Sequence, residues 1–469
     1  MARITSIIKE LLGNAIYLKV SYLLLICFYT ISFLMPLLDG LLKVVLIYGF
    51  LYLVYDLFTR RLFFKAPFVK FLLAFLALYA VTVAINYQKY LWDNFVVLCY
   101  MAVSMLILFP HDPQEDHEKK KRELLLICRL ISWILFATTV LSLLVYLLDI
   151  NLILYYFGKP VYIGVHQNRL WGIYPNPNTS AVLAGLGIAA SMLVWLLKRR
   201  SKKQTVLFCI NFSCQMLLIV LSGSRGGELF LFALFGVILF FFRDKIAARF
   251  TKKHWQDAKK YLVSVICFLV FVASYYALST PIKNAAALVP YGVSMITQSD
   301  GDQEPEDFQP LGREENADTS VDSGRLRLWK ISLQRFAQHP VFGMTAKGLT
   351  DGVITDGAQT EHMHNLYIQI LGSSGILGFL TFMVLKAWIL LRALLYAFRE
   401  KRRDRHYDMM IVLFAVAAAV AVQQLVEVDE LYRVEAIPVI TWILLGYLVC
   451  FLPKKSMAEA ETCENAGVD

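Results

Sequence analysis

The sequence predicts an all-α polytopic membrane protein with about 12 transmembrane helices and one large extracytoplasmic loop between the ninth and tenth helices. Of the 469 residues, 58% are hydrophobic and 17% are charged. Soluble domains contain about 45–50% apolar and about 25% charged residues. The apolar residues form long runs, and a spanning helix needs about 20 of them. These observations argue against a disordered chain, a small disulfide-stapled fold and a soluble multidomain enzyme.

Twelve apolar runs divide the chain into predicted spans. They cover residues 20–38, 41–58, 67–85, 92–109, 124–148, 180–197, 205–221, 227–242, 261–279, 366–391, 408–426 and 436–452. Only Asp39 and Gly40 separate the first two runs, so we expect a hairpin there. The predicted regions are helices 1–9 in residues 1–279, the outer loop in 280–365, helices 10–12 in 366–452 and a cytoplasmic tail in 453–469.

The distribution of positive charge predicts the orientation of these helices. With a cytoplasmic N-terminus, the inner segments hold 31 Lys and Arg residues, whereas the short outer loops hold 5. Cytoplasmic loops carry such an excess, so both termini are predicted to be cytoplasmic. Lys43, Arg129 and Lys386 fall near the ends of spans, where long side chains can reach the head groups. The net charge of +10 therefore indicates a membrane protein and no nucleic-acid partner.

The outer loop contains one predicted amphipathic helix. Residues 323–338 place apolar side chains on one face, Ser323 can cap the start and Pro340 ends the pattern. The apolar side chains are Leu326, Trp329, Leu333 and Phe336. An acidic linker over residues 298–322 precedes this helix, and we assign it no catalytic role.

Two short outer segments carry candidate substrate contacts. Arg169, Trp171 and Asn178 flank two X-Pro pairs that fix a turn before the sixth span. This segment can present Arg169 and Trp171 to a substrate, or it can be an interfacial loop with an aromatic belt residue. Arg225 lies in the glycine-rich turn of residues 222–228, where a helix begins. The guanidinium and the free N–H groups there can hold an anion, although a tight turn with a snorkelling arginine remains the alternative.

The loop helix offers a third candidate site. Arg325 and Trp329 are four residues apart and share a face, so the ring can support the guanidinium. Arg327 lies on another, polar face of the same helix. A basic helix that rests on lipid head groups would have the same pattern.

His364 and Asn365 directly precede the tenth span. The positive end of that helix disfavours a protonated imidazole, so we expect His364 to be neutral and able to accept a proton. A simple helix-cap residue is the alternative. His362 and His364 could suggest a metal, but no cysteine or carboxylate pattern completes a site, and we predict no metal and no other cofactor.

Two further features are expected to be structural. Gly372, Gly375 and Gly378 are predicted to let neighbouring helices pack closely. The acidic turn of residues 427–430 could act as a base or order an arginine, but a solvated turn is favoured.

The predicted orientation places Arg169, Arg225, Arg325 and His364 on the outer side of the membrane. Cationic groups beside a neutral base suit an anionic leaving group and a hydroxyl nucleophile. The chain contains no nucleotide-binding phosphate loop. Because nucleotide sugars are not supplied outside the cytoplasmic membrane, a donor carried by lipid, such as a polyprenyl-diphosphate glycan, is expected.

Four stretches of the sequence share a pattern with a known family. They are Arg169-Leu-Trp-Gly-Ile-Tyr-Pro-Asn-Pro-Asn, Ser222-Gly-Ser-Arg-Gly-Gly, Gly324-Arg-Leu-Arg-Leu-Trp with His339-Pro-Val-Phe-Gly, and His364-Asn followed after nine residues by Gly375-Ile-Leu-Gly. In this order, on the predicted spans, the chain resembles the O-antigen ligase and polymerase superfamily of bacterial membrane glycosyltransferases. The resemblance is close over about residues 165–390.

The resemblance implies a GT-C-like, metal-independent enzyme in the bacterial cytoplasmic membrane. Its donor would be a glycan on undecaprenyl diphosphate, and its acceptor a hydroxyl of a glycan or glycolipid at the outer face. It implies that Arg225 and Arg325 engage the diphosphate and that His364 assists or positions the acceptor. The ligase branch joins the glycan to a lipid A core, as in lipopolysaccharide, and the polymerase branch extends the glycan itself, as for a capsule.

The candidate residues fall into two groups. The candidate catalytic residues are His364, Arg325 and Arg225, and the candidate substrate-binding residues are Arg169, Trp171, Asn178, Arg327, Trp329 and Asn365. Two other classes of protein stay open. A flippase for lipid-linked glycan would place charges within spans and contain internal repeats, which are not seen here. A non-catalytic membrane scaffold would leave the matched arginines without a purpose.

Overall fold

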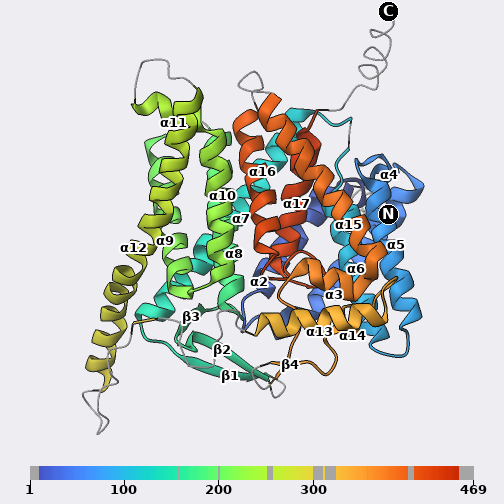
Figure 1. Cartoon of the computed structure of the whole chain (residues 1–469), viewed down its shortest axis with the longest axis horizontal. Helices are drawn as coiled ribbons and strands as arrows, with labels where there is room; N and C mark the ends of the chain where they lie inside the picture. Colours follow the sequence, from blue (N-terminus) through green and yellow to red (C-terminus); the bar gives the residue numbers. More distant parts are fainter. Residues whose placement is uncertain are drawn as a thin grey trace, which may run out of the picture.

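The computed structural model describes residues 10–112, 114–156, 159–198, 201–250, 257–298, 310–311, 324–355, 358–399 and 406–453. Helices dominate these residues, which confirms the α-helical class (Figure 1). Seven of the described helices are long and apolar enough to cross a membrane, and four shorter apolar helices accompany them. The chain is therefore a polytopic membrane protein, while the count of twelve spans stays a prediction.

The helices and strands follow one another along the chain. The longer helices are α2 (Ala15–Tyr29), α3 (Met35–Phe58), α5 (Val69–Ile85), α6 (Leu91–Val103) continued by the π-helical turn η1 (Ser104–Leu108), α7 (His117–Leu147), α8 (Pro177–Leu197), α9 (Lys202–Ser222), α10 (Arg225–Phe241), α12 (Asp257–Gln298), α13 (Arg325–Gln338), α15 (Leu366–Arg399), α16 (Tyr407–Gln423) and α17 (Ala436–Phe451). The short elements are α4 (Leu62–Lys65), α11 (Arg243–Phe250), α14 (Ala346–Thr350), β1 (Leu152–Tyr156), β2 (Lys159–His166), β3 (Arg169–Gly172), β4 (Ile354–Thr355) and β5 (Ala358–Gln359). The strands, α13 and α14 gather at one end of the bundle, and α11 lies at the other (Figure 1).

The first turn corrects one prediction. The chain turns at residues 30–34, and Asp39 and Gly40 lie inside α3 instead of forming a hairpin. Pro36 stands in the first turn of α3, where proline is pre-organised for a helix. Asp39 pairs with Lys43 one helical turn later, at 2.8 Å, so the expected turn residues stabilise the helix instead.

Helix α12 is much longer than the predicted ninth span. It has 42 residues and continues through Pro281 and Pro290 to Gln298, whereas the span was expected to end at residue 279. At about 1.5 Å per residue it is roughly 63 Å long, about twice the thickness of a bilayer core. Its C-terminal part extends past the neighbouring helices (Figure 1). The start of the predicted outer loop is therefore helical.

A three-stranded antiparallel sheet, in the order β1-β2-β3, was not predicted. A tight turn at Gln167 and Asn168 joins β2 to β3, and both residues have a φ of 51°. Two positive φ angles give the turn type whose twist suits a hairpin. The turn returns the chain so that Arg169 pairs with His166.

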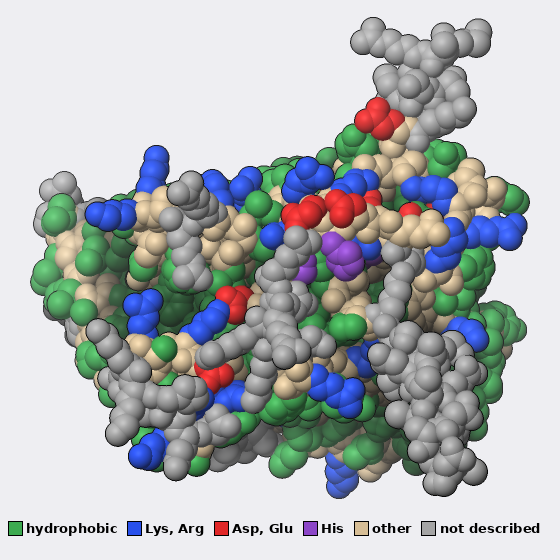
Figure 2. Space-filling model, turned by 90° about the horizontal axis from the view of Figure 1, so that it is seen from above, with side chains coloured by type: hydrophobic (Ala, Val, Ile, Leu, Met, Phe, Trp, Pro, Cys, Tyr) green, Lys and Arg blue, Asp and Glu red, His purple; other side chains and the backbone are tan. Residues whose placement is uncertain are grey.

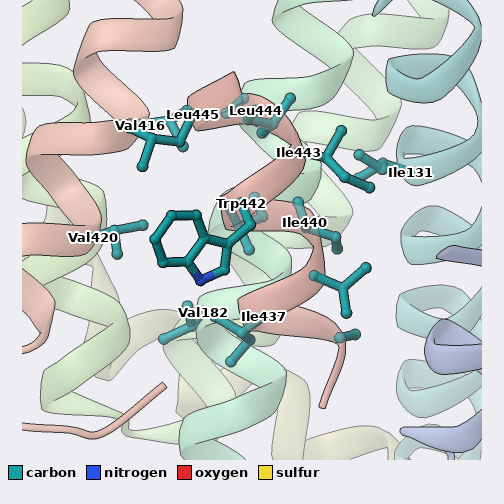
Figure 3. Close-up of a cluster of buried hydrophobic side chains, with 14 of the residues drawn as sticks. Ile131, Val182, Val416, Val420, Ile437, Ile440, Trp442, Ile443, Leu444 and Leu445 are labelled. Atoms are coloured by element: carbon teal, nitrogen blue, oxygen red, sulfur yellow. The ribbon is translucent and has the colours of Figure 1, made fainter. Parts of the chain in front are cut away.

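The core of the bundle surrounds α17, and Trp442 shows how tightly it packs. Trp442 is 1% exposed, and its indole N–H donates to the carbonyl of Glu430 at 3.2 Å. The surrounding side chains come from other helices as well as from α17 (Figure 3). They include Ile131, Val182, Val416 and Val420. This packing holds the turn between α16 and α17 inside the protein.

Gly375 breaks α15 and receives the segment that follows α13. It has φ 63° and ψ −172°, a backbone conformation available essentially only to glycine. The break lets Ile376 N–H donate to the carbonyl of Pro340 at 2.8 Å and Thr345 N–H donate to that of Ser373 at 3.0 Å. A side chain at position 375 would overlap the carbonyl of Val341. The prediction that Gly375 lets a neighbouring helix pack closely is therefore wrong, because the chain that approaches it is a loop.

Replacing Gly375 with alanine should lower the free energy of unfolding by about 2–3 kcal/mol, because it combines backbone strain with overlap. Gly292→Ala in α12 is the matched control, since its new methyl group meets no atom within 4 Å. Unfolding midpoints in detergent compare the two variants. Equal midpoints for the two variants would show that position 375 accepts a side chain without backbone strain or overlap.

Candidate active site

A buried carboxylate, Glu427, joins candidate residues from three separate parts of the chain. Glu427 lies in the turn between α16 and α17 and is 2% exposed. Its Oε1 accepts hydrogen bonds from Asn178 Nδ2 at 2.9 Å and from Arg325 Nη2 at 3.1 Å. Its Oε2 lies 3.1 Å from His364 Nδ1. The expectation of a solvated acidic turn is therefore wrong.

Arg169 extends this cluster through Asn178. The side chain of Asn176 caps α8 by accepting from Asn178 N–H at 2.7 Å, which places Asn178 in the first turn. Asn178 Oδ1 accepts from Arg169 Nη2 at 2.9 Å. Arg169 Nε donates to the carbonyl of Ser222 at 2.8 Å. Arg169 thus connects the β2–β3 hairpin to α8 and to the turn before α10.

Helix α13 brings Arg325 to the cluster. Arg325 is its first residue, and Gly324 before it has a φ of 71°. Trp329 lies one turn on and donates its indole N–H to the carbonyl of Met363 at 3.1 Å. This bond ties α13 to the segment that carries His364.

The buried face of α13 does not coincide with the apolar face predicted from the sequence. Leu326 and Leu333 are 59% and 46% exposed, whereas Leu328 and Ser332 are buried. The helix turns Arg325 toward the protein, so the face that contacts the fold is partly polar. The exposed Leu326 and Leu333 both belong to the apolar face that the sequence predicted.

Asn365 fixes the position of His364. Its Oδ1 accepts from Ile368 N–H at 3.0 Å and so caps α15. Its Nδ2 donates to the carbonyl of Leu425 at 2.9 Å, next to the turn that holds Glu427. His364 itself has a positive φ of 50°. Since both ends of its amide are engaged, Asn365 acts here by positioning its neighbour.

Arg225 lies beside the bonded cluster. It is the first residue of α10, and Ser224 caps this helix by accepting from Gly227 N–H at 3.1 Å. A Cβ atom at Gly226 would lie 3.3 Å from Glu427 Cγ, so the start of α10 lies close to the side chain of Glu427. Arg225 is exposed and lies in electrostatic range of Glu228.

Among the described residues, no hydrogen bond or ion pair joins Trp171 or Arg327 to Glu427. Trp171 packs at 4.9 Å from the ring of His166, centroid to centroid. Its indole N–H is buried and has no hydrogen-bond partner in the described part of the chain. Arg327 is exposed on α13. The structure thus gathers Arg169, Asn178, Arg325 and His364, with Arg225 adjacent.

The charges around Glu427 determine its protonation. Burial alone would raise its pKa, but the hydrogen bond with His364 and the charges of His364, Arg325 and Arg433 outweigh burial, and the pKa of Glu427 is lowered. The ionised carboxylate accepts a hydrogen bond from Nδ1–H of His364. In the neutral tautomer that carries this proton, Nε2 is the nitrogen able to accept another.

His362, His364 and Glu427 could together present a set of metal ligands, since their ligand atoms lie within 4.8 Å of one another. However, the surroundings of these three residues are unfavourable for a metal ion. His362 Nε2 lies 3.3 Å from Arg433 Nη1, and its Nδ1 accepts from His364 N–H at 3.3 Å. Guanidiniums on both His362 and Glu427 would repel a divalent cation. Burial and the charge of Arg433 lower the pKa of His362 well below its usual value, so this ring is neutral.

Comparison with known proteins adds one finding. Residues 210–383 match the family model described as O-antigen ligase. The matched range contains Arg225, Arg325, His364 and the break at Gly375. A comparison with curated proteins gave no match.

Proposed function

From the match of residues 210–383 to the O-antigen ligase family model, we propose that this membrane protein belongs to the O-antigen ligase and polymerase superfamily and is an O-antigen ligase-like glycosyltransferase. It moves a glycan from a polyprenyl-diphosphate carrier to an acceptor hydroxyl at the outer face of the bacterial cytoplasmic membrane. The acceptor is a glycan or glycolipid of the cell surface. A repeat-unit polymerase of the same superfamily is the second candidate, since both reactions need the same site.

The cluster around Glu427 carries this proposal. Its contacts bring Arg325 and His364 to one carboxylate, with Arg225 at the start of the adjoining helix. The guanidinium of Arg325 beside an imidazole that can accept a proton, with Arg225 on the adjoining helix, suits a diphosphate leaving group and a hydroxyl nucleophile. The comparison and the geometry therefore support the same chemistry.

In the proposed reaction, the acceptor oxygen forms a bond to the anomeric carbon as the bond from that carbon to the diphosphate oxygen breaks. Nε2 of His364 takes the acceptor proton, and the electron pair of the broken bond leaves with the diphosphate. Arg225 and Arg325 stabilise the charge that develops there. Glu427 holds His364 in orientation and stabilises the imidazolium that forms. A single displacement of this kind inverts the anomeric centre.

A polar cavity of about 490 Å³ supports binding of a glycan near this site. It lies between the β-sheet region and the extended part of α12, and Asn168 in its wall is the neighbour of Arg169. Its polar and aromatic walls can donate to and accept from sugar hydroxyls. They include Tyr146, Asp149, Asn151, Tyr291 and Ser294. We propose that this cavity receives part of the glycan.

The distribution of charge supports an outward location for the cluster. Lys and Arg side chains are spread across the end of the molecule that carries α11 (Figure 2). The sheet and α13 lie at the opposite end (Figure 1). By the positive-inside tendency, the α11 end faces the cytoplasm. Both termini are then cytoplasmic, and the candidate site faces outward.

Incubating the purified protein in detergent with a polyprenyl-diphosphate-linked glycan and a glycolipid acceptor should yield a new glycosidic bond and free polyprenyl diphosphate. A flippase would give no product under these conditions, because detergent leaves no membrane to cross. The size of the lipid-linked glycan that accumulates in a deletion strain separates the two enzymes. Long unattached chains indicate a ligase, and single repeat units indicate a polymerase.

A further inference from the structure

A second cavity lies between α7, α8 and α9, away from the cluster around Glu427. It has a volume of about 160 Å³ and is close to the C-terminal end of α8, where Lys198 lines it. A hydrogen bond from Asn211 Nδ2 to Ser132 Oγ, 3.0 Å long, joins α9 to α7 in its wall. The proposed reaction leaves this cavity without a role.

Arg129 gives the cavity its charge. It lies on α7, is half-buried and lines the cavity. Within the described residues it makes no hydrogen bond or ion pair, and no carboxylate lines this cavity. An arginine in a membrane-spanning helix usually pairs with a counter-charge or marks a binding site. The missing counter-charge therefore points to an anionic ligand.

Aromatic and apolar side chains form the walls of the cavity around Arg129. Trp195 and Phe208 stack with their centroids 5.8 Å apart, and Trp133 contacts Phe136 edge to face at 6.2 Å. Trp133 is 58% exposed and Leu207 is 38% exposed, so apolar surface continues from the cavity to the outside of the helices. On a spanning bundle that outside is occupied by acyl chains. A small soluble anion would make no favourable apolar contact with these walls.

We infer that this cavity binds an anionic phospholipid, with its phosphate on Arg129 and Lys198 and its upper acyl chain against the aromatic walls. A guanidinium can grip a phosphate by two hydrogen bonds, and basic pockets between spanning helices are suited to acidic head groups. Lys and Arg side chains are spread over the α11 end of the bundle (Figure 2), and such an excess of positive charge is typical of the cytoplasmic side. The lipid would therefore come from the leaflet at that end, opposite to the candidate active site.

The test compares two vesicle lipids with the full-length protein. In native mass spectrometry and in thermal unfolding, phosphatidylglycerol should bind and raise the midpoint, whereas phosphatidylcholine should not. Arg129→Gln should weaken phosphatidylglycerol binding by about fivefold to tenfold, with a smaller loss for Lys198→Gln. Arg122→Gln is the matched control, because Arg122 is exposed on the same helix and does not line the cavity. It should bind like the unchanged protein.

Three results would overturn the inference. An equal rise of the unfolding midpoint with phosphatidylcholine would mean that the cavity does not distinguish lipids by the charge of the head group. An equal loss in Arg122→Gln and Arg129→Gln would mean that charge anywhere on α7 suffices. Competition by soluble glycerol phosphate at similar concentrations would mean that the site takes a free phosphate and not a lipid. None of these results depends on whether the protein transfers glycans.

Discussion

Replacing His364 with alanine should reduce glycan transfer by about 10²–10⁴-fold, because the variant loses the proposed acceptor of the hydroxyl proton. The loss should fall on the turnover rate more than on binding of the donor, since Arg225 and Arg325 remain. Transfer of a radiolabelled or fluorescent glycan by the purified protein measures both quantities. His117→Ala is the control, because His117 is exposed at the start of α7, outside the candidate site.

Glu427→Gln extends this prediction to the residue that holds the histidine. The amide keeps the size of the side chain, but it removes the charge that orients Nδ1–H at 3.1 Å. We expect a large fall in turnover, and the double variant Glu427→Gln/His364→Ala should be little worse than His364→Ala alone. Residues that act as one unit behave in this non-additive way. Losses that multiply would show that the two side chains act separately.

Replacing Lys386 with methionine should destabilise the protein by about 3–5 kcal/mol, because it leaves Glu430 as a buried charge without a partner. Lys386 was expected to snorkel to the membrane surface. Instead it is 5% exposed and donates to Glu430 Oε1 at 2.6 Å, deep in the bundle. Unfolding in detergent, followed by heat or by a chemical denaturant, measures the loss.

The double variant Lys386→Met/Glu430→Leu tests the origin of that loss. Removing both charges should restore most of the stability, since neither a charge nor its desolvation cost remains. Lys43→Met is the matched control. Lys43 pairs with Asp39 on the exposed side of α3, where an ion pair contributes about 0–1 kcal/mol. A double variant as unstable as Lys386→Met would contradict this account.

Hydropathy predicted where the long helices lie, but not where each begins and ends. Asp39-Gly40 resembles a turn, and only the start of α3 at Met35 shows that the chain has already turned. The apolar run of the ninth span ends at residue 279, yet α12 continues through Pro281 and Pro290. The strands of the small sheet have 4 to 8 residues, and their aromatic side chains are equally typical of a membrane interface. Local sequence does not distinguish these cases.

The candidate site was predicted in part for a similar reason. Arg169, Asn178 and His364 stood out because each lies in a polar segment next to a span, and Arg325 because it lies on the predicted amphipathic helix of the outer loop. Glu427 did not, since a carboxylate in a short turn is usually solvated, and only the packing of α16 and α17 buries it. The neighbouring Gln423 and Gln424 were a usable signal: two adjacent amides at the end of an apolar run, both fully buried, bind the same turn.

The order in which the cluster's members occur along the chain has a consequence for biosynthesis. Arg169 is made early, whereas Glu427 emerges only when most of the protein has left the ribosome. A nascent chain that stops before the final pair of helices has inserted cannot join Arg325, Asn178 and His364. Premature termination should therefore yield a chain that is integrated into the bilayer but inert toward its lipid-linked donor.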